Sequence, residues 1–253
     1  MTFEKFQSRV VIEAELLATT PIFIGARTDS FKPGAINGSC VKDVYGRPYV
    51  PGSSLKGVLR AFLSNLFNDP NDSIVDGKEN GKYLKKDQRD KFASPEELAK
   101  KIVSDSTPAE KLFGSKVMAG KVKVADAMLP DKDKVTTEVR NGVAIDRDTH
   151  TALGDSGALF DTEVVPSGTV FSFIASAENL EIDEADWFSK LLEYFANGNI
   201  TVGGRSRAGL GNVKLQNITA TIQYAVPSGF PIEEKIEGGL NGIKEAIRKC
   251  SQN

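Results

Sequence analysis

Residues 51–67 read PGSSLKGVLRAFLSNLF, and this stretch carries the clearest periodic signal in the chain. Its apolar residues recur three and four positions apart: Leu55, Val58, Leu59, Phe62, Leu63, Leu66 and Phe67. That spacing places them on one side of an α-helix and predicts an amphipathic helix packed against a core. Ser53 or Ser54 is the expected N-cap, because a serine hydroxyl can accept a hydrogen bond from the first helical turn.

Segments typical of β-strands lie on both sides of this helix. Strands are expected at residues 9–19, 121–127, 168–178 and 212–225. A second helix, capped by Asp183 and ended by Gly198, precedes the last strand. The order β-α-β followed by β-α-β predicts an α+β fold of the ferredoxin-like βαββαβ type. In that fold two helices cover one face of an antiparallel sheet and leave the other face free.

Three more segments complete the expected organisation. Residues 68–110 are dense in charge and predict a solvated insertion with one short helix, capped by Ser94 ahead of Pro95. Residues 131–165 contain the alternating pieces VAIDRD and LFDTEVV, which indicate a protruding β-hairpin. Residues 236–253 are expected to end in a short helix. We therefore expect residues 1–253 to form a single elaborated domain.

The composition excludes several classes of protein. Cys40, Cys250 and one histidine are too few for a disulfide scaffold or a cysteine–histidine zinc site. No apolar run approaches the roughly 20 residues that span a bilayer. Glu4, Lys5 and Arg9 interrupt the stretch where a signal peptide would be apolar. The expected compartment is the reducing cytoplasm, with no membrane partner.

The glycine-rich loop GGRSRAGLG, residues 203–211, is the strongest candidate site. Its glycines allow close approach of the backbone to a partner, and N–H groups in such a turn can bind an anion. Arg205 and Arg207 add guanidiniums suited to phosphate. The alternative is a structural turn with two solvated arginines. The net charge of −2 means that nucleic-acid binding would need these cations gathered on one surface.

The start of the helix at PGSSLKGVLR, residues 51–60, is a second candidate. Ser53, Ser54 and Lys56 lie in its first turn, where the helix dipole favours an anion, and Arg60 follows one turn later. An ordinary serine cap with an exposed lysine explains the same pattern. The loop GAINGSCVKD, residues 34–43, and His150 in the hairpin are weaker candidates, since a plain surface loop and a solvated histidine account for them.

Taken together, these segments resemble the RAMP-superfamily backbone subunits of type III CRISPR effector complexes. The residues that carry the resemblance are TPIFIGA (20–26), GAINGSCVKD (34–43), GRPYVPGSSLKGVLR (46–60), KLFGS (111–115), VKVADAML (122–129), RNGVAIDRDTHTA (140–152), LFDTEVVPSGTVFSF (159–173) and GGRSRAGLGNVKL (203–215). They span nearly the whole chain. A cysteine pair that some relatives carry in the insertion is absent here.

The resemblance implies an RRM-like palm with a β-hairpin thumb that stacks with other subunits along a guide RNA. The expected partners are the guide CRISPR RNA, a complementary target RNA and other effector subunits, including further RAMP subunits. Phosphates would contact Ser53, Ser54, Lys56, Arg60, Gly203, Gly204, Arg205, Ser206 and Arg207, with Arg27, Lys32 and Lys42 on the same surface. The thumb candidates are Arg140, Val143, Ile145, Asp146, Arg147 and His150, where an aliphatic wedge could unstack bases.

Asn37 stands where catalytic relatives carry an aspartate that supports metal-dependent cleavage of target RNA. A carboxamide has no negative charge and no useful basicity. Loss of one acid–base group typically costs about 10²–10⁴-fold in rate. We therefore expect a chain that binds RNA but cuts it slowly or not at all. No tightly bound cofactor is expected, and Mg²⁺ or Mn²⁺ would be needed only if cleavage is active.

Several alternatives remain open at this point. Asn37 is either natural or a substitution that traps the target uncut, or Asp29 or Asp43 acts in its place. The chain could be an active, metal-dependent endoribonuclease subunit. It could instead be a guide-processing endonuclease in which His150 serves as acid or base, and such an enzyme would survive removal of metal. A ferredoxin-like domain that binds a small ligand is the remaining alternative.

Overall fold

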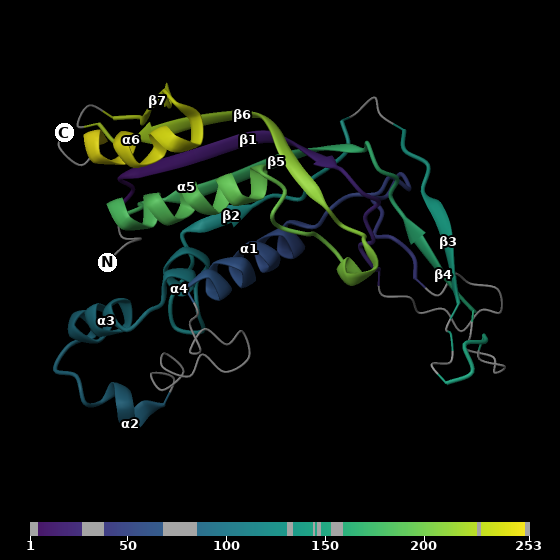
Figure 1. Ribbon diagram of the computed structural model, residues 1–253. Helices are drawn as coiled ribbons and strands as arrows, with labels where there is room; N and C mark the ends of the chain where they lie inside the picture. Colours follow the sequence, from purple (N-terminus) through teal and green to yellow (C-terminus); the bar gives the residue numbers. More distant parts are fainter. Residues whose placement is uncertain are drawn as a thin grey trace.

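The computed structural model describes residues 5–26, 38–67, 85–130, 134–143, 145, 148–152, 159–226 and 229–250. Its main body is an antiparallel sheet with strand order β2-β5-β1-β6-β7 (Figure 1). These strands are β1 (Ser8–Ala18), β2 (Val122–Val124), β5 (Val170–Glu178), β6 (Val213–Tyr224) and β7 (Ile232–Lys235). The four expected strands are confirmed, and β7 is an additional edge strand.

A two-stranded hairpin stands apart from this sheet, as expected for residues 131–165 (Figure 1). It consists of β3 (Glu138–Val143) and β4 (Leu159–Val164), paired antiparallel. The end of β4 returns to the main body through a bridge between Ile22 and Val165. The hairpin is therefore anchored at the end of the sheet where β1 finishes.

The helices of the described residues are α1 (Gly52–Leu66), α2 (Lys86–Arg89), α3 (Pro95–Ser104), α4 (Pro108–Phe113), α5 (Ile182–Ala196) and α6 (Ile243–Cys250), with 3-10 turns η2 (Ser206–Ala208) and η3 (Gly239–Gly242). Helices α1, α4, α5 and α6 lie against one side of the sheet, whereas α2 and α3 stand away from it (Figure 1). The insertion thus holds α2 and α4 besides the one helix that the sequence predicted there. Among the described residues, no helix has the length and apolar character needed to cross a membrane.

The core lies between the sheet and helices α1 and α5. Leu55, Leu59 and Leu63 of α1 are buried, as their periodicity predicted. Phe173 of β5 and Phe195 of α5 are fully buried with ring centroids 5.6 Å apart in an edge-to-face arrangement. Burial of such a side chain contributes about 1.5–3 kcal/mol. This packing fixes the α+β architecture expected from the sequence.

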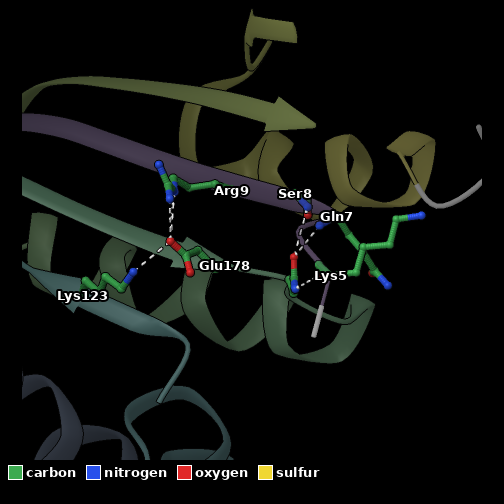
Figure 2. A network of polar contacts seen from close by, with 7 residues as sticks. Lys5, Gln7, Ser8, Arg9, Lys123 and Glu178 are labelled. Atoms are coloured by element: carbon green, nitrogen blue, oxygen red, sulfur yellow. Dashed lines mark hydrogen bonds and ion pairs between the residues drawn. The ribbon is translucent and has the colours of Figure 1, made fainter. Parts of the chain in front are cut away.

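The opposite face of the sheet is polar. Glu178 of β5 accepts hydrogen bonds from Arg9 of β1 at 2.7 Å and Lys123 of β2 at 2.9 Å, and so links three strands (Figure 2). The hydrogen bond from Lys123 is the main cause that lowers the pKa of Glu178. Glu13 and Ile174 are exposed on this face, and no outward-facing position of β1, β5 or β6 is aromatic. These three strands therefore offer no ring on which a base could stack, although the ring centroid of Phe6, ahead of β1, lies 5.7 Å from the Arg9 guanidinium carbon.

The helix ends confirm some predicted caps and contradict others. Ser94 accepts a hydrogen bond from the Glu97 amide and caps α3, as predicted. Neither Ser53 nor Ser54 caps α1, because that helix begins at Gly52 with Pro51 at the N-cap. Asp183 does not cap α5 either, because the helix begins earlier, at Ile182, where Glu181 and Glu184 form a capping box. Gly198 follows the end of α5 with a φ of 79°, as predicted.

Candidate nucleic-acid interface

The glycine-rich loop 203–211 is held against residues 21–24, which follow β1. Backbone hydrogen bonds of 2.8 Å run from Gly204 N to Phe23 O and from Gly211 N to Pro21 O. Gly203 has a φ of 88°, and a Cβ there would lie 2.2 Å from the Phe23 carbonyl oxygen. Only glycine tolerates both the left-handed backbone and this close approach. The conformation of the loop therefore requires glycine at position 203.

The two arginines of this loop reach the surface. Residues 203–209 are all exposed, including Arg205 and Arg207. Arg205 adopts a left-handed φ of 60°, and its guanidinium carbon lies 5.6 Å from the centroid of the Phe23 ring. A cation over an aromatic face is attracted to it, so the ring helps to orient the guanidinium. This geometry presents two cations beside exposed glycine backbone, as an anion site requires.

The Phe23 ring brings the glycine loop and the loop 34–43 together. Cβ atoms built on Gly25, Gly38 and Gly204 would lie 3.2, 3.0 and 3.2 Å from atoms of this ring. The three glycines come from separate segments, and each leaves room for the ring. Asn37 lies outside the described residues, but Gly38, its neighbour in the chain, contacts the same ring as Gly204. Two of the predicted segments therefore meet at one place.

The described part of loop 34–43 also joins the base of the hairpin. Gly38 forms a parallel bridge with Thr162 of β4, and the Glu163 amide donates to the Gly38 carbonyl at 2.8 Å. On its other side, Cys40 pairs with Gly25. Arg140 of β3 lies opposite Thr162 in the hairpin register and is exposed. Arg140 is thus connected to the glycine loop through Thr162, Gly38 and the ring of Phe23.

Lys42 is engaged with a buried carboxylate. Its ammonium forms an ion pair with Glu163, whose side chain also accepts hydrogen bonds from the Cys40 amide and the Thr137 hydroxyl. Burial works to raise the pKa of Glu163, but the hydrogen bonds from Lys42, Thr137 and Cys40 outweigh it and the pKa is lowered. Nothing in its sequence context distinguished Lys42 from the other expected phosphate ligands.

The hairpin carries the apolar side chains that a wedge would need. Val139, Val143 and Ile145 are 51%, 46% and 63% exposed. Ile145 bridges to Ala152, and His150 nearby is exposed with a left-handed φ of 57°. Asp146 and Arg147 lie outside the described residues, as do Arg27, Lys32 and Asp29.

The start of α1 packs on the end of β2, whose last residue Val124 pairs with Ala175 of β5 and so lies level with Ile12, in the middle of β1. Its first amide is already bonded, because Gly52 N donates to the Asp126 carboxylate at 2.7 Å. A Cβ on Gly52 would lie 2.3 Å from the Val124 carbonyl oxygen, so the helix tip packs directly on the end of β2. A carboxylate at this terminus competes with the anion that the sequence predicted there.

The basic residues of α1 are partly turned toward the protein. Arg60 Nη1 donates to the carbonyl oxygen of Gly114 at 2.6 Å, and Gly114 is the residue that ends α4. Lys56 is half-buried, and burial, followed by the charge of Arg60, lowers its pKa from the ordinary 10.5. Ser53 is exposed and Ser54 half-buried. This group is thus less available than the glycine loop.

Asp43, one alternative to Asn37, has a structural task in a tight turn. Its carboxylate accepts from the amides of Tyr45 and Arg47 at 2.9 Å and from Arg47 Nε at 2.8 Å. Within the described residues, no three His, Cys, Asp or Glu side chains gather as they would around a metal ion. The described residues around loop 38–43 therefore do not form a cation site.

Three residues of this region were not expected from the sequence: Phe23, Asp126 and Glu163. Each acts on a partner far away in the chain, as Glu163 does on Lys42, 121 positions earlier. The sequence shows an aromatic residue in TPIFIGA and a carboxylate in LFDTEVV. Their partners could be found only from the folded chain.

Comparisons with known proteins agree with this geometry. The sequence model of the RAMP superfamily matches residues 15–214. The chain is 26% identical over 259 residues to "CRISPR system Cms endoribonuclease Csm3" of Methanocaldococcus jannaschii, covering 98% of this chain and 91% of that protein. It is 25% identical over 243 residues to the protein of the same name from Streptococcus thermophilus, covering 88% and 93%.

Proposed function

This chain belongs to the RAMP superfamily, and we propose that it is the guide-RNA-binding backbone subunit of a type III CRISPR effector complex. Its similarity to Csm3 proteins over nearly their whole length supports this proposal. In that role it binds the guide CRISPR RNA and its complementary target and stacks with other effector subunits, including further RAMP subunits, in the cytoplasm. Sequence is then read by base pairing, and the protein contacts the RNA backbone.

The observation that carries the proposal is that Phe23 brings loop 203–211 and the end of loop 34–43 together, and that the latter pairs with the base of the hairpin through Gly38. The exposed backbone of loop 203–211 with Arg205 and Arg207, the end of loop 34–43 and the base of the hairpin with Arg140 lie together. Exposed amides and paired guanidiniums bind phosphate without selecting a base. A surface of this kind suits RNA molecules that differ in base sequence but share the same sugar-phosphate backbone.

The architecture supports the same role. Strand order β2-β5-β1-β6, with α1 and α5 as the two crossovers, is the order of a ferredoxin-like, RRM-like palm. The open face is polar, with Glu13 and Glu178, and no outward-facing position of β1, β5 or β6 is aromatic, so we assign RNA to the end of the sheet and to the hairpin. The exposed Val143 and Ile145 then serve as the wedge that holds bases unstacked.

We further propose that this subunit binds target RNA and cleaves it slowly or not at all, because Asn37 replaces the aspartate of catalytic relatives. The other described candidate, Asp43, has its carboxylate bonded within a turn, which supports the assignment to position 37. The competing functions are an active endoribonuclease and a guide-processing enzyme that uses His150. Our proposal routes no step through a metal ion.

Binding is tested by filter binding of guide RNA at two or more salt concentrations. Phosphate contacts should give a log–log slope of about −0.7 for each phosphate on single-stranded RNA. Weak binding that is insensitive to salt would contradict an RNA-backbone interface and favour the small-ligand alternative.

Cleavage is tested in the complex assembled with guide RNA, supplied with target RNA and Mg²⁺ or Mn²⁺. The unaltered chain should leave the target intact, and Asn37→Asp should raise cleavage by about 10²-fold or more. Rapid cleavage by the unaltered chain would overturn the assignment. Guide processing that survives chelation and is lost in His150→Ala would support the competing enzyme.

A further inference from the structure

Glu163 connects three segments that are far apart in the sequence. Its residue is 6% exposed, and its carboxylate accepts hydrogen bonds from the Cys40 amide, the Lys42 ammonium and the Thr137 hydroxyl. Cys40 and Lys42 belong to the loop that carries Asn37, whereas Thr137 leads directly into β3 of the hairpin. We call these four residues the Glu163 cluster: Cys40, Lys42, Thr137 and Glu163.

The backbone of Glu163 adds two further connections to the same loop. Its amide donates to the Gly38 carbonyl at 2.8 Å. Its carbonyl accepts from the Cys40 thiol, with sulfur and oxygen 3.0 Å apart. The side chain and the backbone of one residue thus hold residues 38–42 from both sides, immediately after Asn37.

The charges in the cluster show why the connection is stable. A buried carboxylate is costly unless it is paired and hydrogen-bonded. Here Lys42 supplies the opposite charge and the Cys40 and Thr137 groups supply the remaining hydrogen bonds. Removal of the acceptor would leave the Cys40 amide and the Lys42 ammonium without their partner, so the loop would open more often.

We propose that Glu163 is a positioning residue that fixes the loop of Asn37 to the base of the hairpin, and that Lys42 serves this cluster and not an RNA phosphate. The catalytic importance of position 37 rests on the proposed function. The contacts that join Glu163 to residues 38–42 do not depend on that function, and their effect can be measured in the purified chain without RNA.

The two cysteines of the chain provide that measurement. Cys40 is buried in the cluster and Cys250 is half-buried on α6, so alkylation of Cys40 reports opening of loop 38–42 and Cys250 is the internal reference. Glu163→Gln should accelerate alkylation of Cys40 by about tenfold or more and leave Cys250 unchanged. Peptide mass spectrometry separates the two sites.

A matched control is Glu178→Gln, which removes a carboxylate that also joins two cations but lies on the open face of the sheet. It should change neither alkylation rate. If Glu163→Gln fails to fold, Thr137→Val removes one donor while keeping the shape and the buried ion pair, and it should still accelerate Cys40 a few-fold. Equal acceleration of both cysteines, or of neither, would overturn the proposal.

RNA binding separates the two roles of Lys42. Lys42→Met should leave the salt slope of guide-RNA binding unchanged, whereas Arg207→Ala should make it shallower by about 0.7. A change of that size in Lys42→Met would place Lys42 on the RNA and refute its assignment. If the unaltered chain does not bind RNA at all, the proposed function fails, and the alkylation rates still decide the role of Glu163.

Where Asn37→Asp restores cleavage, adding Glu163→Gln should lower kcat and leave KM unchanged, because a loosened loop misplaces the reacting group without removing phosphate contacts. Lys42→Arg in the same background should retain activity, since it keeps the charge. An unchanged kcat in the Glu163 variant would contradict a positioning role.

Discussion

The glycine loop 203–211 and the start of α1 carry the same sequence signal, but the fold treats them differently. Both combine glycine or serine with basic residues, but the glycine loop lies beyond the end of β1, whereas the start of α1 packs on the end of β2. In the glycine loop, residues 203–209 are exposed, Arg205 and Arg207 among them, although the Gly204 and Gly211 amides are bonded to residues 21–23. At the start of α1, the first amide is bonded to Asp126 and Arg60 is bonded to Gly114.

The difference shows that a basic, glycine-containing motif predicts an anion site only when the fold leaves its basic side chains exposed, as it does for Arg205 and Arg207 but not for Arg60. Asp126 lies within the expected strand 121–127, two residues after Val124, and nothing in the sequence near α1 predicts its contact with Gly52. The dipole of α1 still favours negative charge, but a carboxylate of the protein already occupies that position. We therefore rank the glycine loop above the helix tip as a contact for RNA.

The largest expected effect comes from filling the glycine loop. Gly203→Ala forces a Cβ against the Phe23 carbonyl oxygen in addition to a left-handed backbone, and should cost about 3 kcal/mol of unfolding free energy. Gly209→Ala is the matched control, because its φ is 81° but no atom lies within 4 Å of the added Cβ. It should cost only about 1 kcal/mol. Urea denaturation measures both, and equal losses would contradict the close approach to Phe23.

The next effect concerns charge in the same loop. Arg205→Ala combined with Arg207→Ala should weaken guide-RNA binding by about 30-fold and make the salt slope shallower by about 1.4. Arg248→Ala with Lys249→Ala removes the same charge from α6 and should have little effect. Ser53→Ala should also change affinity less than twofold, because Ser53 carries no charge and lies at a helix start where the Asp126 carboxylate disfavours phosphate. Equal losses for the loop and α6 pairs would mean that RNA senses only net charge.

Asp126→Asn tests the other half of the comparison. The loss of a carboxylate at the tip of α1 should lower stability by about 0.5–1 kcal/mol, while guide-RNA affinity rises about two- to fivefold at low salt. Asp183→Asn makes the same charge change in the first turn of α5, at the opposite end of the sheet, and should not alter affinity. Weaker RNA binding in Asp126→Asn would show that the start of α1 does not bind phosphate even after the Asp126 carboxylate is removed.

The smallest effect is a pH dependence in the segment beside the glycine loop. The folded-state pKa of Glu163 lies below its ordinary 4.5, so its charge stabilises the fold above that pH and the benefit is lost as pH falls through the folded pKa. The stability gap between the unaltered chain and Glu163→Gln should therefore be full near neutral pH and shrink below pH 4.5. Urea midpoints across this range measure it. A gap that stays constant would show that Glu163 is not ionised in the cluster.

The sequence predicted the elements whose signals are local. The periodic leucines of α1, the Ser94 cap of α3 and Gly198 after α5 all follow from residues within a few positions of each other. The sequence offered the same reason to expect a phosphate contact at Lys42 and at Arg207, because both are basic residues in polar loops. In the folded chain Lys42 forms an ion pair with the buried Glu163, 121 positions later. The predicted serine cap of α1 was wrong because the helix begins earlier, at Gly52 with Pro51 at the N-cap, where the Gly52 amide donates to the distant Asp126.

The three glycines around the Phe23 ring make the effect of a substitution at one of these positions depend on the residues at the others. Gly25, Gly38 and Gly204 each border the ring, so a side chain at any one of them requires the ring to shift by a few tenths of an ångström. A smaller residue at position 23 would relieve this crowding, and it would also remove the surface on which Arg205 rests. The effects of substitutions at these four positions should therefore depend on one another, and a library that varies them together would accept combinations that single changes do not reveal.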